Sequence, residues 1–234
     1  MPLPPTADHR GSLRRTALVA GVLYLVTFAS SIPAVFLLDP VLNDPGYVVG
    51  PGADAQVRLG CLLDLVNAFA CVGTAVALFS VVKREHEGLA LGFVMSRMYE
   101  AAVILIGVVS LLAVVSLRQP GATGAPADAL VAVARGLVAV RNWTFLLGPS
   151  LAPGINAALL GTLLYRARLV PRLIPTLGLI GAPLLLLSTL ATLLGVNQQM
   201  SAFTAIATLP IFLWELSLGL WMTFRGFKDA EASV

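Results

Sequence analysis

The sequence predicts an all-α, polytopic integral membrane protein, with residues 1–234 forming a single domain of six transmembrane helices. The first observation is composition: 58% of the residues are hydrophobic, 12% are charged and the mean hydropathy is +0.89, against roughly 45–50% and 25% in soluble domains. The second is that apolar runs of roughly 20 residues, the length that crosses a bilayer, alternate with short basic groups. These groups form no single patch, which argues against nucleic acid as a partner. The lipid bilayer is the expected partner.

Six apolar runs are each long enough to cross a membrane. They cover residues 16–38, 59–82, 89–117, 143–165, 173–196 and 202–225. The first run follows Arg14 and Arg15 and resembles the start of a secretory signal peptide. Its roughly 23 residues exceed the 7–15 apolar residues of a signal peptide, so we expect it to remain as the first transmembrane helix.

The loop between the first and second runs, residues 38–58, is rich in proline and glycine. We expect an ordered, turn-rich outer loop without a regular element. The second run contains both cysteines, Cys61 and Cys71. They lie about 15 Å apart along one helix, too far for a disulfide bond, and we interpret both as small apolar packing residues.

The third run carries two charges, Arg97 and Glu100, which lie on one helical face. Because a charge in hydrocarbon costs several kcal/mol, both require polar partners on other helices. Between the third and fourth runs, residues 127–140 predict a short helix lying at the outer interface, with Arg135 and Arg141 reaching toward lipid headgroups. The alternative is a lid over an outward-facing cavity.

The two sides of the membrane differ in how many basic residues their loops and chain ends carry. Ten of the fifteen basic residues fall on the side that also holds both chain ends: Arg10, Arg14, Arg15, Lys83, Arg84, Arg166, Arg168, Arg172, Arg225 and Lys228. The loop between the last two runs, residues 197–201, has no charge. The positive-inside rule therefore predicts that the N- and C-termini are cytoplasmic, in a bacterial inner membrane.

Four polar residues on three helices share one depth when 1.5 Å per residue is counted from the cytoplasmic ends of the runs. They are Arg97, Glu100, Asn156 and Glu215. We expect Arg97 to bridge Glu100 and Glu215. Two interpretations stay open: the cluster only locks helices together, or it lines a cavity and binds a ligand.

A second polar group lies nearer the outer end of the second run. Asp64 is followed one turn later by Asn67, and Asp64 can pair with Arg58 at the surface or with Arg141 across helices. An interfacial ion pair is one interpretation. A second, outward-facing polar site formed by Asp64, Asn67 and Arg141 is the other.

Sequence signatures of catalysis are missing. The two histidines, His9 and His86, lie outside the apolar runs, and the chain has no P-loop, no GxSxG and no Cys/His cluster. The sequence therefore predicts no catalytic residues, no metal and no cofactor, and it favours a non-enzymatic role. We expect a protein that binds or transports a small or lipid-like ligand at the Arg/Glu cluster. The alternative is a non-catalytic membrane scaffold or regulatory protein.

Three stretches resemble a bacterial membrane family, the domain of unknown function 4386. They are residues 92–107 (GFVMSRMYEAAVILIG), 163–181 (LLYRARLVPRLIPTLGLIG) and 210–219 (PIFLWELSLG). The resemblance extends over nearly the whole chain. It implies a six-helix integral membrane protein, and it assigns Arg97, Glu100 and Glu215 to the family's arginine–glutamate and tryptophan–glutamate motifs without giving them a role.

Overall fold

The computed structural model describes residues 7–118 and 124–228, which form helices joined by short connections. The helices are α1 (Ala7–Leu37), α2 (Asp39–Asn43), α3 (Asp54–Val82), α4 (Glu87–Leu117), α5 (Ala127–Phe145), the π-helical turn η1 (Leu146–Ser150), α6 (Ala152–Ala167), α7 (Leu173–Leu193) and α8 (Ala202–Phe224).

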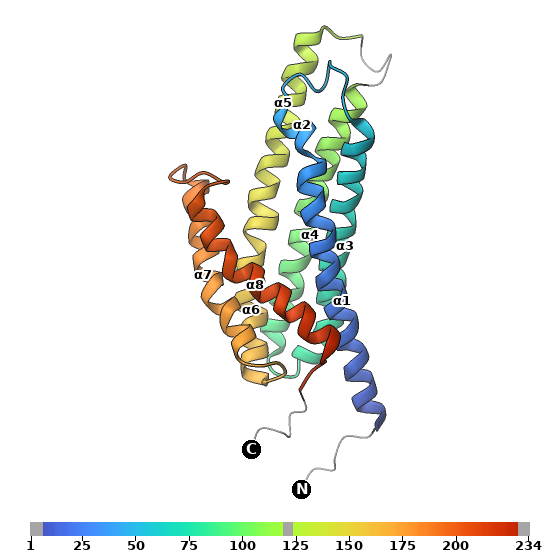
Figure 1. Ribbon diagram of the computed structural model, residues 1–234. Helices are drawn as coiled ribbons and strands as arrows, with labels where there is room; N and C mark the ends of the chain where they lie inside the picture. The colour runs from blue at the N-terminus through green and yellow to red at the C-terminus, as the bar shows by residue number, and fades with distance from the viewer. Residues whose placement is uncertain (1–6, 119–123, 229–234) are drawn as a thin grey trace.

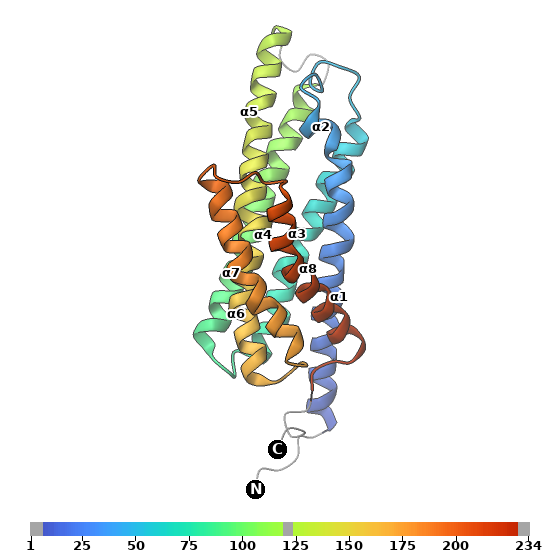
Figure 2. The same cartoon turned by 60° about the vertical axis from the view of Figure 1, so that its left-hand side comes forward.

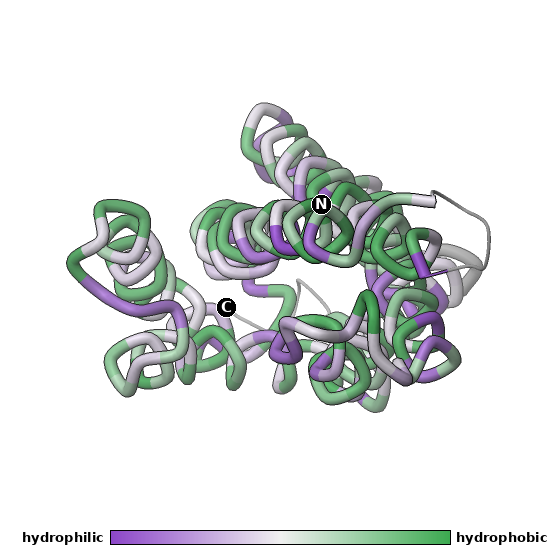
Figure 3. Tube along the Cα trace, turned by 90° about the horizontal axis from the view of Figure 1, so that it is seen from above, coloured by the Kyte–Doolittle hydropathy of each residue, from purple (hydrophilic) through white to green (hydrophobic). Residues whose placement is uncertain are grey.

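Six helical segments in the described part of the chain are long and apolar enough to cross a membrane. They are Gly11–Leu37, Asp54–Val82, Glu87–Leu117, Ala127–Ala167, Leu173–Leu193 and Ala202–Phe224. Apolar residues are distributed throughout the bundle (Figure 3). The predicted all-α bundle of six spans is therefore confirmed, and the chain has the structure of a multi-pass membrane protein.

The bundle has a long half and a short half (Figures 1 and 2). In the long half α1, α3, α4 and α5 stand side by side, with α1 against α3, α3 against α4, and α4 against α5. In the short half α7 packs between α6 and α8, and α8 runs obliquely to the lower part of α1. The first and last long helices of the chain are thus neighbours.

One end of the bundle gathers the start of α1 and the end of α8. Arg14 donates hydrogen bonds to the backbone carbonyls of Met222, Thr223 and Phe224, at 3.1, 3.0 and 3.2 Å. These carbonyls belong to the last turn of α8, where no helical donor follows, so Arg14 caps that helix from another part of the chain. Arg166 pairs with Glu85 at this same end, at 3.0 Å.

The opposite end is closed by the loop from residue 38 to residue 53. Arg118 pairs with Asp54 at 2.6 Å and also donates to the backbone carbonyl of Tyr47. The Tyr47 hydroxyl donates to Asp54 at 2.8 Å, and burial together with this bond raises the pKa of the tyrosine. The expectation of a loop without regular structure was wrong for its first part, because Pro40 occupies the first turn of the short helix α2, where proline is tolerated.

The helix expected over residues 127–140 exists, as part of α5, but it does not lie flat as a separate element. α5, η1 and α6 form one continuous rod that stands along α4. The reason is packing: Leu130, Ala134 and Leu137 lie in one apolar cluster with Val114 of α4. The apolar side of α5 is therefore covered by protein, which turns Arg141 inward.

Two apolar cores follow one another along the bundle. Phe93, Leu160 and Trp214 belong to the first, and Ile104 and Leu111 belong to the second. On α4, Arg97 and Glu100 lie between the residues that enter these two cores. A charged layer therefore separates two hydrocarbon-like regions inside the same bundle.

Candidate functional site

Arg97 is the centre of the charged layer. Its side chain is only 2% exposed, and Nη1 donates to Glu100 Oε2 at 3.0 Å on the same helix. Nη2 donates to Glu215 Oε1 of α8 at 2.8 Å. The expected bridge from α4 to α8 is therefore present, with charge-assisted geometry on both sides.

Asn156 connects a third helix to this cluster. Its Nδ2 donates to Glu100 Oε2 at 2.8 Å, so one carboxylate oxygen of Glu100 accepts bonds from both Asn156 and Arg97. The structure thus brings together the four residues that the sequence placed at one depth. Their contacts with one another are as expected, while a ligand-binding role for them is a separate question.

Three residues around Arg97 were missed by the sequence analysis. The rings of Tyr24 and Phe93 lie 5.0 and 5.9 Å from the Arg97 guanidinium carbon, within the range of cation–π attraction. Arg97 Nη1 also donates to the Cys71 sulfur at 3.6 Å, so Cys71 is a polar contact as well as a packing residue. A lone tyrosine in the first apolar run was the available signal for Tyr24.

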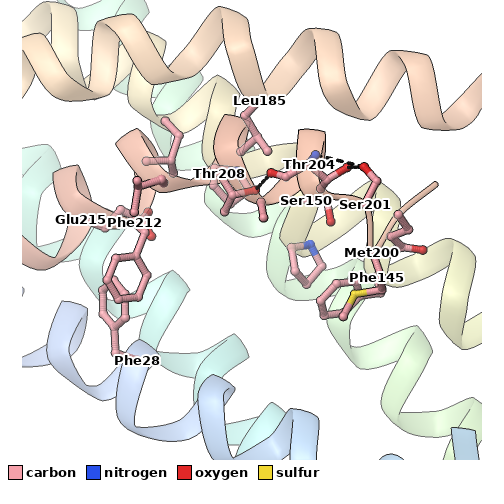
Figure 4. A pocket seen from close by; sticks show the side chains of 16 residues that line it. Phe28, Phe145, Ser150, Leu185, Met200, Ser201, Thr204, Thr208, Phe212 and Glu215 are labelled. Carbon is pink, nitrogen blue, oxygen red and sulfur yellow. Dashed lines mark hydrogen bonds between the residues drawn. The ribbon is translucent and has the colours of Figure 1, made fainter. Parts of the chain in front are cut away.

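A cavity of about 610 Å³ opens between α1, η1, α7 and α8. Figure 4 shows Phe28, Phe212 and Glu215 together at one end, and Ser150, Ser201 and Thr204 at the other. The lining as a whole is predominantly apolar. It includes Pro149, Pro153, Leu185, Leu209 and Ile211. Glu215 therefore belongs both to the charged layer and to the cavity wall.

The outer polar group is organised around a second buried ion pair. Arg141 Nη2 donates to Asp64 Oδ2 at 2.7 Å, which selects Arg141 rather than Arg58 as the partner of Asp64. Asn67 lines a cavity of about 220 Å³ together with both residues, and its Oδ1 accepts a weak hydrogen bond from the Cys71 thiol at 3.9 Å. The pair packs against Gly107 of α4. A side chain at this position would crowd Arg141, because a Cβ on Gly107 would lie 3.0 Å from Arg141 Cδ.

Several buried polar atoms in these two groups have no hydrogen-bond partner among the described residues. They are Arg97 Nε, Asn156 Oδ1, Arg141 Nε and Arg141 Nη1. A buried donor or acceptor without a partner costs about 1–3 kcal/mol. Both groups therefore retain hydrogen-bonding capacity that the protein itself does not use.

Comparison with known proteins finds one family. The model of the family described as "Domain of unknown function (DUF4386)" matches residues 19–226, which is most of the chain. No curated protein and no solved structure matches the sequence or the fold. The matched region includes Arg97, Glu100, Asn156 and Glu215, the four residues of the charged layer.

Proposed function

The chain belongs to the DUF4386 family, and from the geometry of its charged layer we propose that it binds, and moves across or within the membrane, an amphiphilic small molecule or a lipid-like ligand. The observation that carries this proposal is the position of Glu215. Its side chain is 14% exposed and lies on the cavity wall, while Glu100, at 6%, does not line the cavity. A ligand in the cavity would therefore reach the Arg/Glu cluster through Glu215.

The chemistry of the cavity fits an amphiphile. Apolar side chains make up most of its lining. Glu215 lies at one end, the Ser201 and Thr204 hydroxyls lie at the other, and Thr208 lies between them. From Ser201 to Glu215 the helix α8 advances about 21 Å at 1.5 Å per residue. Volumes of 300–1,000 Å³ are typical of small-molecule sites, and the cavity, at about 610 Å³, is of that size.

For the cellular setting we propose a bacterial inner membrane, with both termini in the cytoplasm. Support comes from the basic residues at the end of the bundle where α1 begins and α8 ends, including Arg14, Arg166 and Arg225. Under the positive-inside rule such an excess marks the cytoplasmic side.

A second candidate function is a non-catalytic scaffold or regulatory protein, in which the charged layer only holds helices together. One observation favours the scaffold: Arg97 and Asn156 connect α4, α6 and α8 through hydrogen bonds between protein side chains, without a ligand. In that case the cavity would be filled by bulk lipid and would have no selectivity.

Filling the cavity separates the two candidates. Ala205 lines the cavity, and in Ala205→Trp the indole would occupy the space of the ligand. We expect the purified variant to lose the thermal stabilisation that hydrophobic probes such as Nile red give to the wild type, since a ligand at 100 times its Kd stabilises by about 2.7 kcal/mol.

The matched control is Ile206→Trp, one residue further along α8. Ile206 is 70% exposed and lies outside the cavity lining, so this variant should respond to the probe as the wild type does. Equal stabilisation of both variants and the wild type would contradict ligand binding in this cavity and leave the scaffold as the better candidate.

A further inference from the structure

The charged layer has unequal numbers of acidic and basic groups. Arg97 contributes one positive charge, and Glu100 and Glu215 contribute two negative charges when ionised. Within residues 7–118 and 124–228, Arg97 is the cation that pairs with either carboxylate. The other side chains around Arg97, namely Tyr24 of α1, Cys71 of α3 and Asn156 of α6, carry no charge in their ordinary states. When both carboxylates are ionised, the layer therefore holds one surplus negative charge.

A surplus charge inside a membrane protein is costly because the low dielectric strengthens the electrostatic penalty. The penalty is relieved when a counter-charge lies close to the carboxylate or when the carboxylate takes up a proton. α7, which packs on α8, has no titratable residue that could supply one. The counter-charge can approach from the cavity, since Glu215 lies on its wall. Of the two Glu215 oxygens, Oε1 accepts the bond from Arg97, and the described residues give Oε2 no donor.

The cavity around Glu215 suits an organic cation better than a hydrated metal ion. Phe28 and Phe212 contact each other edge to face, with ring centroids 5.2 Å apart, and both line the cavity beside Glu215 (Figure 4). Aromatic faces attract cations that have little bound water. Leu209 and Ile211 add apolar surface to the cavity lining, and the Thr208 hydroxyl donates to the backbone carbonyl of Thr204.

We propose that the ligand of this cavity is a lipophilic cation, whose positive charge lies against Glu215 and beside the Phe28–Phe212 ring pair and whose apolar body fills the cavity toward η1. The inference rests on the proposed function, because it names the chemical class of the ligand for the same cavity. The inference extends the proposed function by predicting the sign of the ligand's charge.

A pair of ions of the same shape tests the charge directly. Tetraphenylphosphonium and tetraphenylborate are rigid, apolar and nearly identical in size, and they carry opposite charges. Equilibrium dialysis on the full chain in detergent micelles should show tetraphenylphosphonium binding at least tenfold more tightly than tetraphenylborate. The same tenfold preference should be lost in Glu215→Gln, which keeps an acceptor for Arg97 and leaves Arg97 and Glu100 as a balanced pair.

Glu85→Gln is the matched control, since Glu85 is a carboxylate paired with Arg166 at the end of the bundle, outside the cavity. It should retain the wild-type preference. Equal binding of both ions by the wild type, no binding of either, or an unchanged preference in Glu215→Gln would overturn the inference. If both ions bind equally and Ala205→Trp abolishes both, the ligand cavity stands and only the charge assignment fails.

Discussion

Arg97 shows at the residue scale how a buried charge is stabilised in this bundle. Both of its Nη groups donate to carboxylates, two aromatic rings lie within 6 Å of its guanidinium carbon, and its side chain is almost fully enclosed. A pair of this kind gains little over apolar residues of similar volume, yet loss of one partner leaves an uncompensated charge. Single substitutions in this cluster should therefore be much more damaging than combined ones.

Arg97→Ala should destabilise the protein by about 3–5 kcal/mol, because Glu100 and Glu215 would then face each other without a cation. The change in unfolding free energy is measured by unfolding the protein in detergent and monitoring the loss of its helical circular dichroism signal. Arg166→Ala breaks an exposed ion pair with Glu85 and should cost about 0–1 kcal/mol. A triple change of Arg97, Glu100 and Glu215 to methionine should recover most of the stability. A triple variant as unstable as Arg97→Ala would contradict this account of the cluster.

The sequence predicted this cluster because intramembrane charges are few and helical rise fixes their depth. Arg97, Glu215 and Asn156 could be grouped by counting from the ends of the runs. The cavity beside Glu215 could not be predicted in this way. It depends on how far α8 tilts from α1 and on where Phe28 and Phe212 meet, which are properties of packing between distant segments.

Two glycines let α1 and α8 approach each other closely. A Cβ placed on Gly21 would lie 2.5 Å from the Thr223 backbone nitrogen, and one on Gly219 would lie 3.1 Å from Tyr24 Cβ. Small residues at such positions let two backbones come close, which is a common source of helix association in membranes. The position of α8, and with it of Glu215, depends on this contact.

Gly21→Ala should therefore destabilise the bundle by about 1–3 kcal/mol, since the added methyl group meets backbone atoms that cannot move aside easily. Thermal unfolding of the purified variant measures the effect. Gly136→Ala on α5 is the control, because nothing lies within 4 Å of its added Cβ and alanine favours a helix over glycine by about 1 kcal/mol. Equal melting temperatures for the two variants would argue against a close α1–α8 contact.

The helix over residues 127–140 illustrates a limit of sequence analysis at the element scale. The sequence correctly predicted a helix there, but it could not show whether lipid or protein covers the apolar side chains of that helix. Here α4 covers them, and η1 carries the chain on into α6 without a break. Pro149 within η1 provides a physical reason for the irregular turn, because proline removes a backbone donor from the helix.

At the scale of the whole molecule, the two halves of the bundle differ in length. α7 has 21 residues and α4 has 31, or about 31 and 46 Å at 1.5 Å per residue. A hydrocarbon layer of about 30 Å matches the length of α7 and is much shorter than α4. The long half must therefore extend beyond the layer, and the loop fastened by Arg118 is placed to lie in the aqueous or headgroup region.

The orientation of the protein in the membrane can be tested with fused reporters whose activity depends on the side of the membrane. A reporter fused after Val234 should be active in the cytoplasm, because the basic end of the bundle is expected there. The same reporter inserted at Gln198, in the uncharged loop between α7 and α8, should be active on the opposite side. Periplasmic activity of the fusion after Val234 would overturn the assignment.

The contact between Arg14 and the last turn of α8 has a consequence for biosynthesis. It joins residues 208 to 210 positions apart in the chain, which a ribosome making 5–20 residues per second separates by about 10–40 s. During that interval α1 has no α8 beside Gly21, and Arg97 has no Glu215. We expect α1 to dock fully only after α8 has been inserted, so a chain that stops before α8 leaves its first helix incompletely packed and open to cellular proteases.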